Sequence, residues 1–291
     1  MYEADAANVV VSPALIEALH PWALSAFDET AEAFRFIIRE LGQGKAEDEI
    51  DRRLHELATS CGLSDERLLQ RLKSKQAGDI DGAEALWKRL GSLRIVKTLV
   101  LACQRYWSWG AADLFRLRIT SAQGYLRLEA EAAALIALFQ DDDDLAERWS
   151  STHGDKEGSK FFRETQPRLK QVLERFDLAR VYGIVSGSSQ HVRMASVVRS
   201  LKSSGGILSL PDQEFDKDDP FSFHLAVAHF HRIQGRVLTS LGLLVLGGND
   251  QWKALETGFI ARSDDMWRAL ESTYSEEIPD ADELENPKAD L

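Results

Sequence analysis

The sequence predicts an all-α protein, an irregular helical bundle with a small charged helical part at its N-terminal side. The seven prolines lie between candidate helices and not inside them. Apolar residues recur at helical spacing over most of the 291 residues, whereas short extended pieces are expected only at residues 8–12 and 205–211. A chain of this length can bury a stable core without disulfides.

The N-terminal helical part is expected to cover residues 1–78. A helix over 21–41 places its aromatic and aliphatic residues on one stripe. Two shorter, more charged helices follow at 46–62 and 64–76, and Ser64 is suited to cap the second.

The main helical bundle is expected to cover residues 79–275. Its predicted helices lie at 82–111, 112–140, 141–151, 165–177, 181–200, 220–248 and 250–274. Residues 154–160 are expected to form a polar loop, with Pro167 in the first turn of the helix that follows. Asn249 or Asp250 can cap the last helix. Residues 276–291 are expected to form a disordered acidic tail.

Composition argues against some classes of partner, although it does not exclude a local basic patch. The formal net charge of −12 works against non-specific binding of nucleic acid. Two distant cysteines without a CxxC motif favour a reducing compartment. No apolar run is long enough to span a bilayer, and the acidic N-terminus lacks the basic start of a signal peptide. We therefore expect a cytoplasmic protein that does not bind membranes.

The stretch "VYGIVSGSSQHVRMASVVRS", residues 181–200, combines hydroxyl groups with one imidazole. A Ser–His pair can act as nucleophile and base, but it also needs an orienting carboxylate and an oxyanion hole. No GxSxG motif is present. We therefore favour a single helix whose Gly–Ser face packs inward, with His191 reaching Glu129 or Glu131.

Three histidines lie in "FHLAVAHFH", at positions 224, 229 and 231. His224 and His231 share a helix face but stand two turns apart, about 10 Å by helix rise. Neither HExxH nor an i,i+4 histidine pair is present. A metal would need further ligands from elsewhere, so ordinary packing is the preferred interpretation, and we expect no metal and no cofactor.

The segment "RWSSTH" places Arg148 and His153 at the Arg-four-residues-His spacing of RNA-cleaving members of the HEPN class, in which both residues act on the scissile phosphate. Roughly one or two such matches are expected by chance in a chain with this many arginines and histidines. A metal-independent ribonuclease of a toxin or phage-defence type is therefore the alternative hypothesis, with Arg148 and His153 as its catalytic residues. Nucleic acid is a partner only under this alternative.

Residues 110–200 as a whole show a second, diffuse resemblance. The step from Arg127 to Glu129 before apolar residues, and the later Tyr182, Ser186, His191 pattern, resemble uncharacterised all-helical bacterial proteins likened to the HEPN fold. This resemblance implies a helical bundle, often dimeric, with these five side chains near one polar ligand-binding pocket. It implies no particular reaction.

The leading functional hypothesis is an intracellular interaction module that self-associates as a dimer and binds a protein or small molecule. Tyr106, Trp107 and Trp109 lie close together and can line an interface, although core packing is the commoner use of such residues. Nothing in the sequence decides whether the chain is an enzyme.

Overall fold

The structure is a computed structural model that describes residues 21–116, 118–152, 155–176, 178–179, 202–204, 207–209, 221–247 and 249–274. The prediction of an all-α bundle is confirmed, because helices form almost all of this part of the chain. The exception is a pair of antiparallel strands of three residues each, β1 (Lys202–Ser204) and β2 (Ile207–Ser209).

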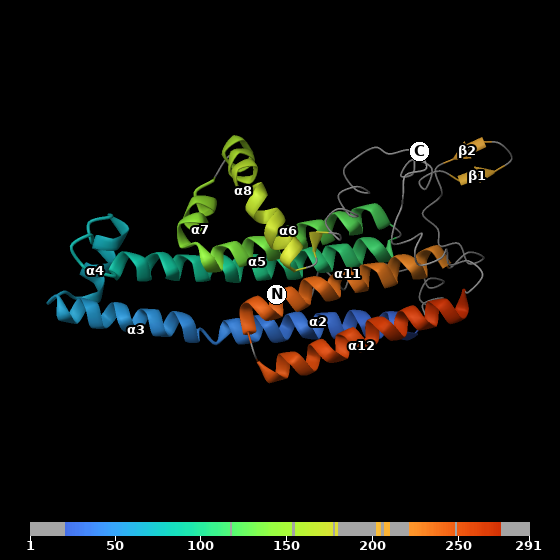
Figure 1. Ribbon diagram of the computed structural model, residues 1–291, viewed down its shortest axis with the longest axis horizontal. Helices are drawn as coiled ribbons and strands as arrows, with labels where there is room; N and C mark the ends of the chain where they lie inside the picture. Colours follow the sequence, from blue (N-terminus) through green and yellow to red (C-terminus); the bar gives the residue numbers. More distant parts are fainter. Residues whose placement is uncertain are drawn as a thin grey trace.

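The helices follow in chain order, and the longest of them run along one axis of an elongated molecule (Figure 1). Their bounds are α2 Pro21–Gly42, α3 Lys45–Ser60, α4 Asp65–Lys73, α5 Ala83–Phe115, α6 Ile119–Asp141, α7 Asp143–Ser150, α8 Asp155–Arg175, α11 Phe221–Leu246 and α12 Asp250–Thr273.

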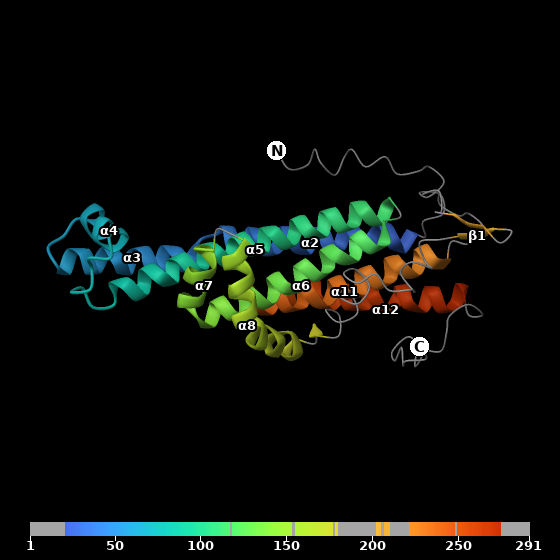
Figure 2. The same ribbon diagram turned by 90° about the horizontal axis from the view of Figure 1, so that it is seen from above.

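Helix α11 occupies the middle of the bundle. It packs against α2, α5, α6 and α12. Helices α5 and α6 form a long antiparallel hairpin on one side of it, as both views show (Figure 2). At the opposite end from the β pair, α3 continues the line of α2 after Gly44, whose left-handed φ of 68° suits glycine.

Polar caps explain where several helices begin. The Ser64 hydroxyl accepts a hydrogen bond from the Arg67 amide, as the sequence predicts. The Asn249 side chain accepts from the amides of Gln251 and Trp252, at 2.9 and 3.1 Å. These caps satisfy amides that have no partner within the helix.

Two predicted boundaries are wrong. Residues 155–160 belong to α8 and not to a loop, so Pro167 lies inside this helix. The helix continues through the proline because buried residues recur every four positions on both sides of it, at Phe161, Thr165, Leu169 and Leu173. The boundary expected between residues 111 and 112 is also wrong, because α5 continues to Phe115. Gly110 lies inside this helix and provides room for Phe230 of α11, which a Cβ at this position would meet at 3.0 Å.

Buried residues form three apolar clusters. The main cluster lies around Phe34, Val100, Ile136, Val237 and Leu241, in the middle of the bundle. The end cluster lies near the C-terminus of α5 and includes Leu114, Leu126, Val227, Phe230 and Met266. The tip cluster joins α3, α4 and the first turns of α5 through Ile50, Leu54, Leu68, Leu72 and Leu90.

This packing groups the elements differently from the expected division near residue 78. Helix α2 belongs to the main and end clusters, whereas the tip cluster extends to Leu90. The expected tail at 276–291 and the expected extended piece at 8–12 lie outside the described residues.

Two glycines of α11 allow α12 to approach closely. A Cβ at Gly242 would lie 1.8 Å from the indole of Trp252, and one at Gly235 would lie 2.7 Å from the ring of Phe259. Both aromatic side chains are buried, and both pairs are seven residues apart on their helices. Since glycine is the residue type without a Cβ, only glycine at these two positions of α11 leaves room for the two rings.

Gly242→Ala should consequently destabilise the protein, although alanine is by about 1 kcal/mol the better helix former. The added methyl group displaces a buried indole, and such overpacking costs typically about 1–3 kcal/mol. Denaturant unfolding of the variant measures the difference.

Gly258→Ala provides the matched control. Gly258 lies in the interior of α12, and a Cβ there has no atom within 4 Å. This substitution should raise the free energy of unfolding by up to about 1 kcal/mol. Equal responses at Gly242 and Gly258 would contradict the proposed packing.

Candidate functional site

Exposed apolar side chains lie on the outer side of the α5–α6 hairpin. Leu101, Trp109 and Leu128 are 50%, 40% and 38% exposed, which is high for large apolar side chains. The ring of Trp109 contacts those of Tyr106 and Tyr125, with centroids at 6.1 and 5.6 Å. The guanidinium of Arg105 stands 4.8 Å above the Trp109 ring. We name this surface the Trp109 face; it consists of Leu101, Arg105, Tyr106, Trp109, Tyr125 and Leu128.

Neighbouring tryptophans have different environments. Trp107 packs beside both the main and the end cluster, with its ring 5.8 Å from that of Phe34. Trp109, two residues later, points to the other side of α5 because successive helical residues are 100° apart. The two alternatives for this segment, core packing and an interface, thus apply to different residues.

The charge of the Trp109 face differs from that of the whole protein. Helix α5 has no acidic residue between Glu84 and Asp113. Exposed cations occur there at Arg94 and Arg105, and within the described chain neither has a carboxylate within 4 Å that forms an ion pair. On α6 the charge of Glu131 reaches Tyr106 but is paired with Arg127. The α5 side of the face is therefore apolar to basic on a protein with a net charge of −12.

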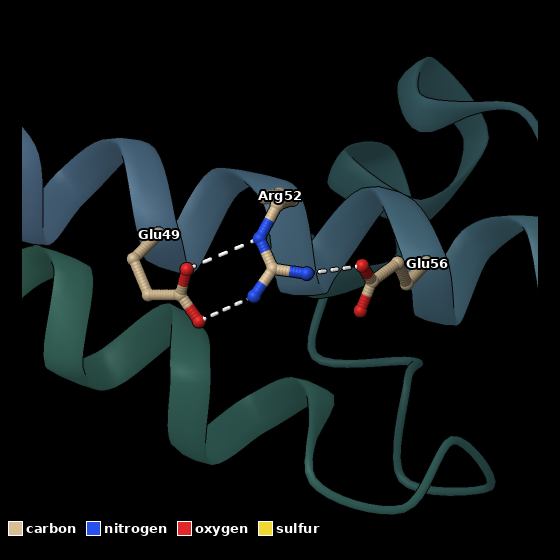
Figure 3. A network of polar contacts seen from close by, with 3 residues as sticks. All are labelled: Glu49, Arg52 and Glu56. Atoms are coloured by element: carbon tan, nitrogen blue, oxygen red, sulfur yellow. Dashed lines mark hydrogen bonds and ion pairs between the residues drawn. The ribbon is translucent and has the colours of Figure 1, made fainter.

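Cations elsewhere on the surface are commonly paired with acids. On α3, Arg52 lies between Glu49 and Glu56 and contacts both carboxylates (Figure 3). Such exposed pairs contribute little to stability. They do neutralise Arg52, so this side chain is not free to meet a phosphate backbone.

The ligand-binding residues predicted from the sequence are only partly within the described chain. The Arg127 Nε donates to Glu131 Oε1 at 3.1 Å, as the i,i+4 spacing predicts. Glu129 faces inward and is fully buried. Tyr182, Ser186 and His191 lie outside the described residues, as does the helix expected over 181–200.

Arg148, the arginine of the ribonuclease hypothesis, lies on α7 and pairs with Glu164 of α8, with Nη2 and Oε2 2.7 Å apart. Its guanidinium is also 5.8 Å from the Phe161 ring. The aspartates that precede it pair with Lys88, Arg89 and Arg168. His153 lies outside the described residues, so its role beside Arg148 stays a prediction.

The histidines of α11 have separate aromatic partners. His224 Nδ1 is 2.7 Å from the Tyr274 hydroxyl, and the His229 ring meets the edge of Trp267. His231 stacks on Phe259 at 4.3 Å between centroids, with 10° between the ring planes. Within the described chain, no group of three or more His, Cys, Asp or Glu residues is arranged to hold a metal ion.

Comparison with known proteins finds no relative of this chain. No protein-family model matches the chain, and neither the curated proteins nor the solved structures contain a significant match. Among the described helices, none combines the length and apolar character needed to cross a membrane.

Sequence reasoning missed Leu101, Arg105, Tyr125 and Leu128. A usable signal is present: the exposed positions of α5 at 94, 98, 101, 105 and 109 follow helical spacing, and no acid interrupts them. Periodicity alone does not reveal which stripe of a two-sided helix is left uncovered.

His231 makes the stability of the bundle sensitive to acid. Burial, and secondarily the charge of Arg262, lower its pKa from 6.5 to about 4. Below pH 6.5 the unfolded chain binds a proton at this imidazole that the folded chain does not, so the contribution of His231 to stability falls between pH 6.5 and 4, by up to about 3 kcal/mol. His231→Phe keeps a ring against Phe259 and should remove this loss, measured by unfolding at pH 7 and 4.5.

His55→Gln is the control for this experiment. The side chain of His55 on α3 is 64% exposed and pairs with Asp65, so its loss should leave most of the acid sensitivity in place. Parallel losses of stability in the wild type and in His231→Phe would show that His231 is not responsible.

Proposed function

We propose that this chain is a helical interaction module that self-associates through the Trp109 face. The observation that carries the proposal is the 40% exposure of Trp109, which follows Leu101 and Arg105 along the same exposed stripe of α5. Tryptophan, tyrosine and arginine are the residues most enriched at the energetic centres of protein interfaces.

Electrostatics favours a second copy at this face. Two copies with a net charge of −12 repel one another over most of their surfaces. The middle of α5 carries no carboxylate between Glu84 and Asp113, and the nearby Glu131 of α6 is paired with Arg127, so two copies approach there without unpaired acidic side chains. Arg105 can stack on aromatic rings, so it does not require a carboxylate partner.

A two-fold axis fits the spacing of the exposed stripe. If two α5 helices pack antiparallel with the axis near residue 105, Leu101 of one copy lies opposite Trp109 of the other. Such a contact is isologous, which is the commonest arrangement in homodimers. Tyr125 and Leu128 of α6 would widen it to both helices of the hairpin.

A reducing compartment is consistent with this proposal. Both cysteines are free thiols, Cys61 exposed and Cys103 buried. We therefore also propose a cytoplasmic location, as the cysteine usage of the sequence predicts.

Trp109→Ser should weaken self-association. Truncating a central interface tryptophan costs about 2 kcal/mol or more, equivalent to about a thirtyfold weaker dimer. Sedimentation velocity of the full chain across the micromolar range should show a concentration-dependent dimer for the wild type and a monomer for the variant. The melting temperature should hardly change, because the ring is substantially exposed.

Ile260→Ser is the matched control for the sedimentation experiment. Ile260 is 51% exposed on α12, outside the Trp109 face, and its replacement should leave the dimer intact. A wild type that stays monomeric at all concentrations, or a dimer that only Ile260→Ser dissociates, would refute the proposal.

The ribonuclease hypothesis is distinguished by a cleavage assay on labelled RNA. It requires activity that Arg148→Ala abolishes and that Arg163→Ala, an exposed arginine on α8, preserves. The ion pair between Arg148 and Glu164 argues against this hypothesis, since it neutralises the cation that would meet the phosphate. We expect no cleavage by either variant or by the wild type.

A further inference from the structure

Two polar side chains lie where the main and end clusters meet. Glu129 of α6 and Gln234 of α11 are both fully buried. On α6, Glu129 is preceded by Leu126 of the end cluster and followed by Ala130 of the main cluster. On α11, Gln234 lies between Phe230 of the end cluster and Val237 of the main cluster. The two polar groups thus form a polar layer between two apolar regions.

These side chains face each other, but other polar groups do not satisfy them. The Gln234 amide is close enough to Glu129 to favour the charged carboxylate, which only partly opposes the effect of burial. Within the described chain, both carboxyl oxygens and both amide atoms lack a partner at hydrogen-bonding geometry. A buried ionised carboxylate without a cation is strongly disfavoured.

We propose that Glu129 and Gln234 form a proton-dependent contact that holds α6 against α11 when the carboxyl group is protonated and weakens when it ionises. A neutral carboxyl O–H can donate to the Gln234 carbonyl while the Gln234 amide N–H donates to the other carboxyl oxygen. This pairing satisfies all four atoms. Ionisation removes the donor and leaves a negative charge beside the amide oxygen.

The same contact fixes the register of the two helices. A shift of α6 along α11 by one turn would place Glu129 or Gln234 against an apolar cluster without a partner. Buried polar groups in helical assemblies are known to select register at some cost in stability.

Other groups around the layer are neutral or paired in the range from pH 5 to 8. The Cys103 thiol of α5, whose Sγ lies 3.9 Å from the Glu129 carbonyl oxygen, has a pKa raised well above its usual value by burial and by the charge of Glu129. His231, one turn before Gln234, is neutral above about pH 4. Arg127 pairs with Glu131 on the same helix.

The direction of the pH dependence follows from burial. The pKa of Glu129 is raised well above its usual value of 4.5, chiefly because the carboxyl group is buried. The stabilising contribution of the neutral carboxyl is complete below pH 4.5 and is lost as the pH rises through the folded-state pKa. Until that pKa is reached, opening of the α6–α11 contact becomes tenfold more frequent for each pH unit.

Glu129→Gln tests the proposal, because it keeps the shape and removes the ionisation. Hydrogen exchange of the full chain, corrected for intrinsic rates, should show protection of α6 and α11 falling by up to tenfold per unit from pH 7 to 8.5 in the wild type, a range above that in which His229 and His231 change stability. In Glu129→Gln this protection should be independent of pH, and the melting temperature at pH 8.5 should exceed that of the wild type.

Glu131→Gln, two residues away on the same helix, is the matched control and should retain the wild-type pH profile. The proposal is overturned if wild type and Glu129→Gln show parallel profiles, or if Glu131→Gln also abolishes the pH dependence. Neither outcome bears on self-association, because Glu129 and Gln234 are buried and lie outside the Trp109 face.

Discussion

The close approach of α12 to α11 is the contact on which the rest of the bundle depends. Gly235 and Gly242 provide the flat surface, and Phe259 and Trp252 occupy it. Trp252 in turn stacks on Phe36 of α2, with ring centroids 6.5 Å apart. Since α11 also packs on α5 and α6, a wider separation here would loosen α2 from the centre and expose part of the main cluster.

The sequence was sufficient to predict most of the helices but not how they group. Caps such as Ser64 and Asn249 and the helical spacing of apolar residues are local signals, and the structure confirms them. The helix boundary at Pro167 was predicted wrongly, because a proline inside a helix is tolerated when packing on both sides of it is strong, and that packing is tertiary.

Glu129 could be singled out from the sequence as a costly buried charge, but its partner Gln234 lies on a helix far along the chain. Trp107 and Trp109 are equivalent by composition, and only the packing of α2 and α11 separates them.

The charge distribution separates two kinds of surface. Acidic and basic residues on α3, α7 and α8 mostly neutralise each other, as between Arg52 and Glu49 or between Arg148 and Glu164. On the outer side of α5, acids are missing and Arg105 rests on an aromatic ring. The inner side of the same hairpin carries the polar layer at Glu129, so a single pair of helices combines the exposed face with the proton-dependent contact.

The different burial of the two thiols has a practical consequence. Cys61 is exposed at the C-terminal end of α3, at the extremity of the molecule formed by α3 and α4, whereas Cys103 is buried in the main cluster (Figure 1). A maleimide fluorophore therefore labels the native chain at one defined point without mutagenesis. Because the Trp109 face lies toward the opposite end of α5, energy transfer between two labelled copies reports on how they are oriented: antiparallel α5 helices hold their dyes far apart, and parallel ones bring them together.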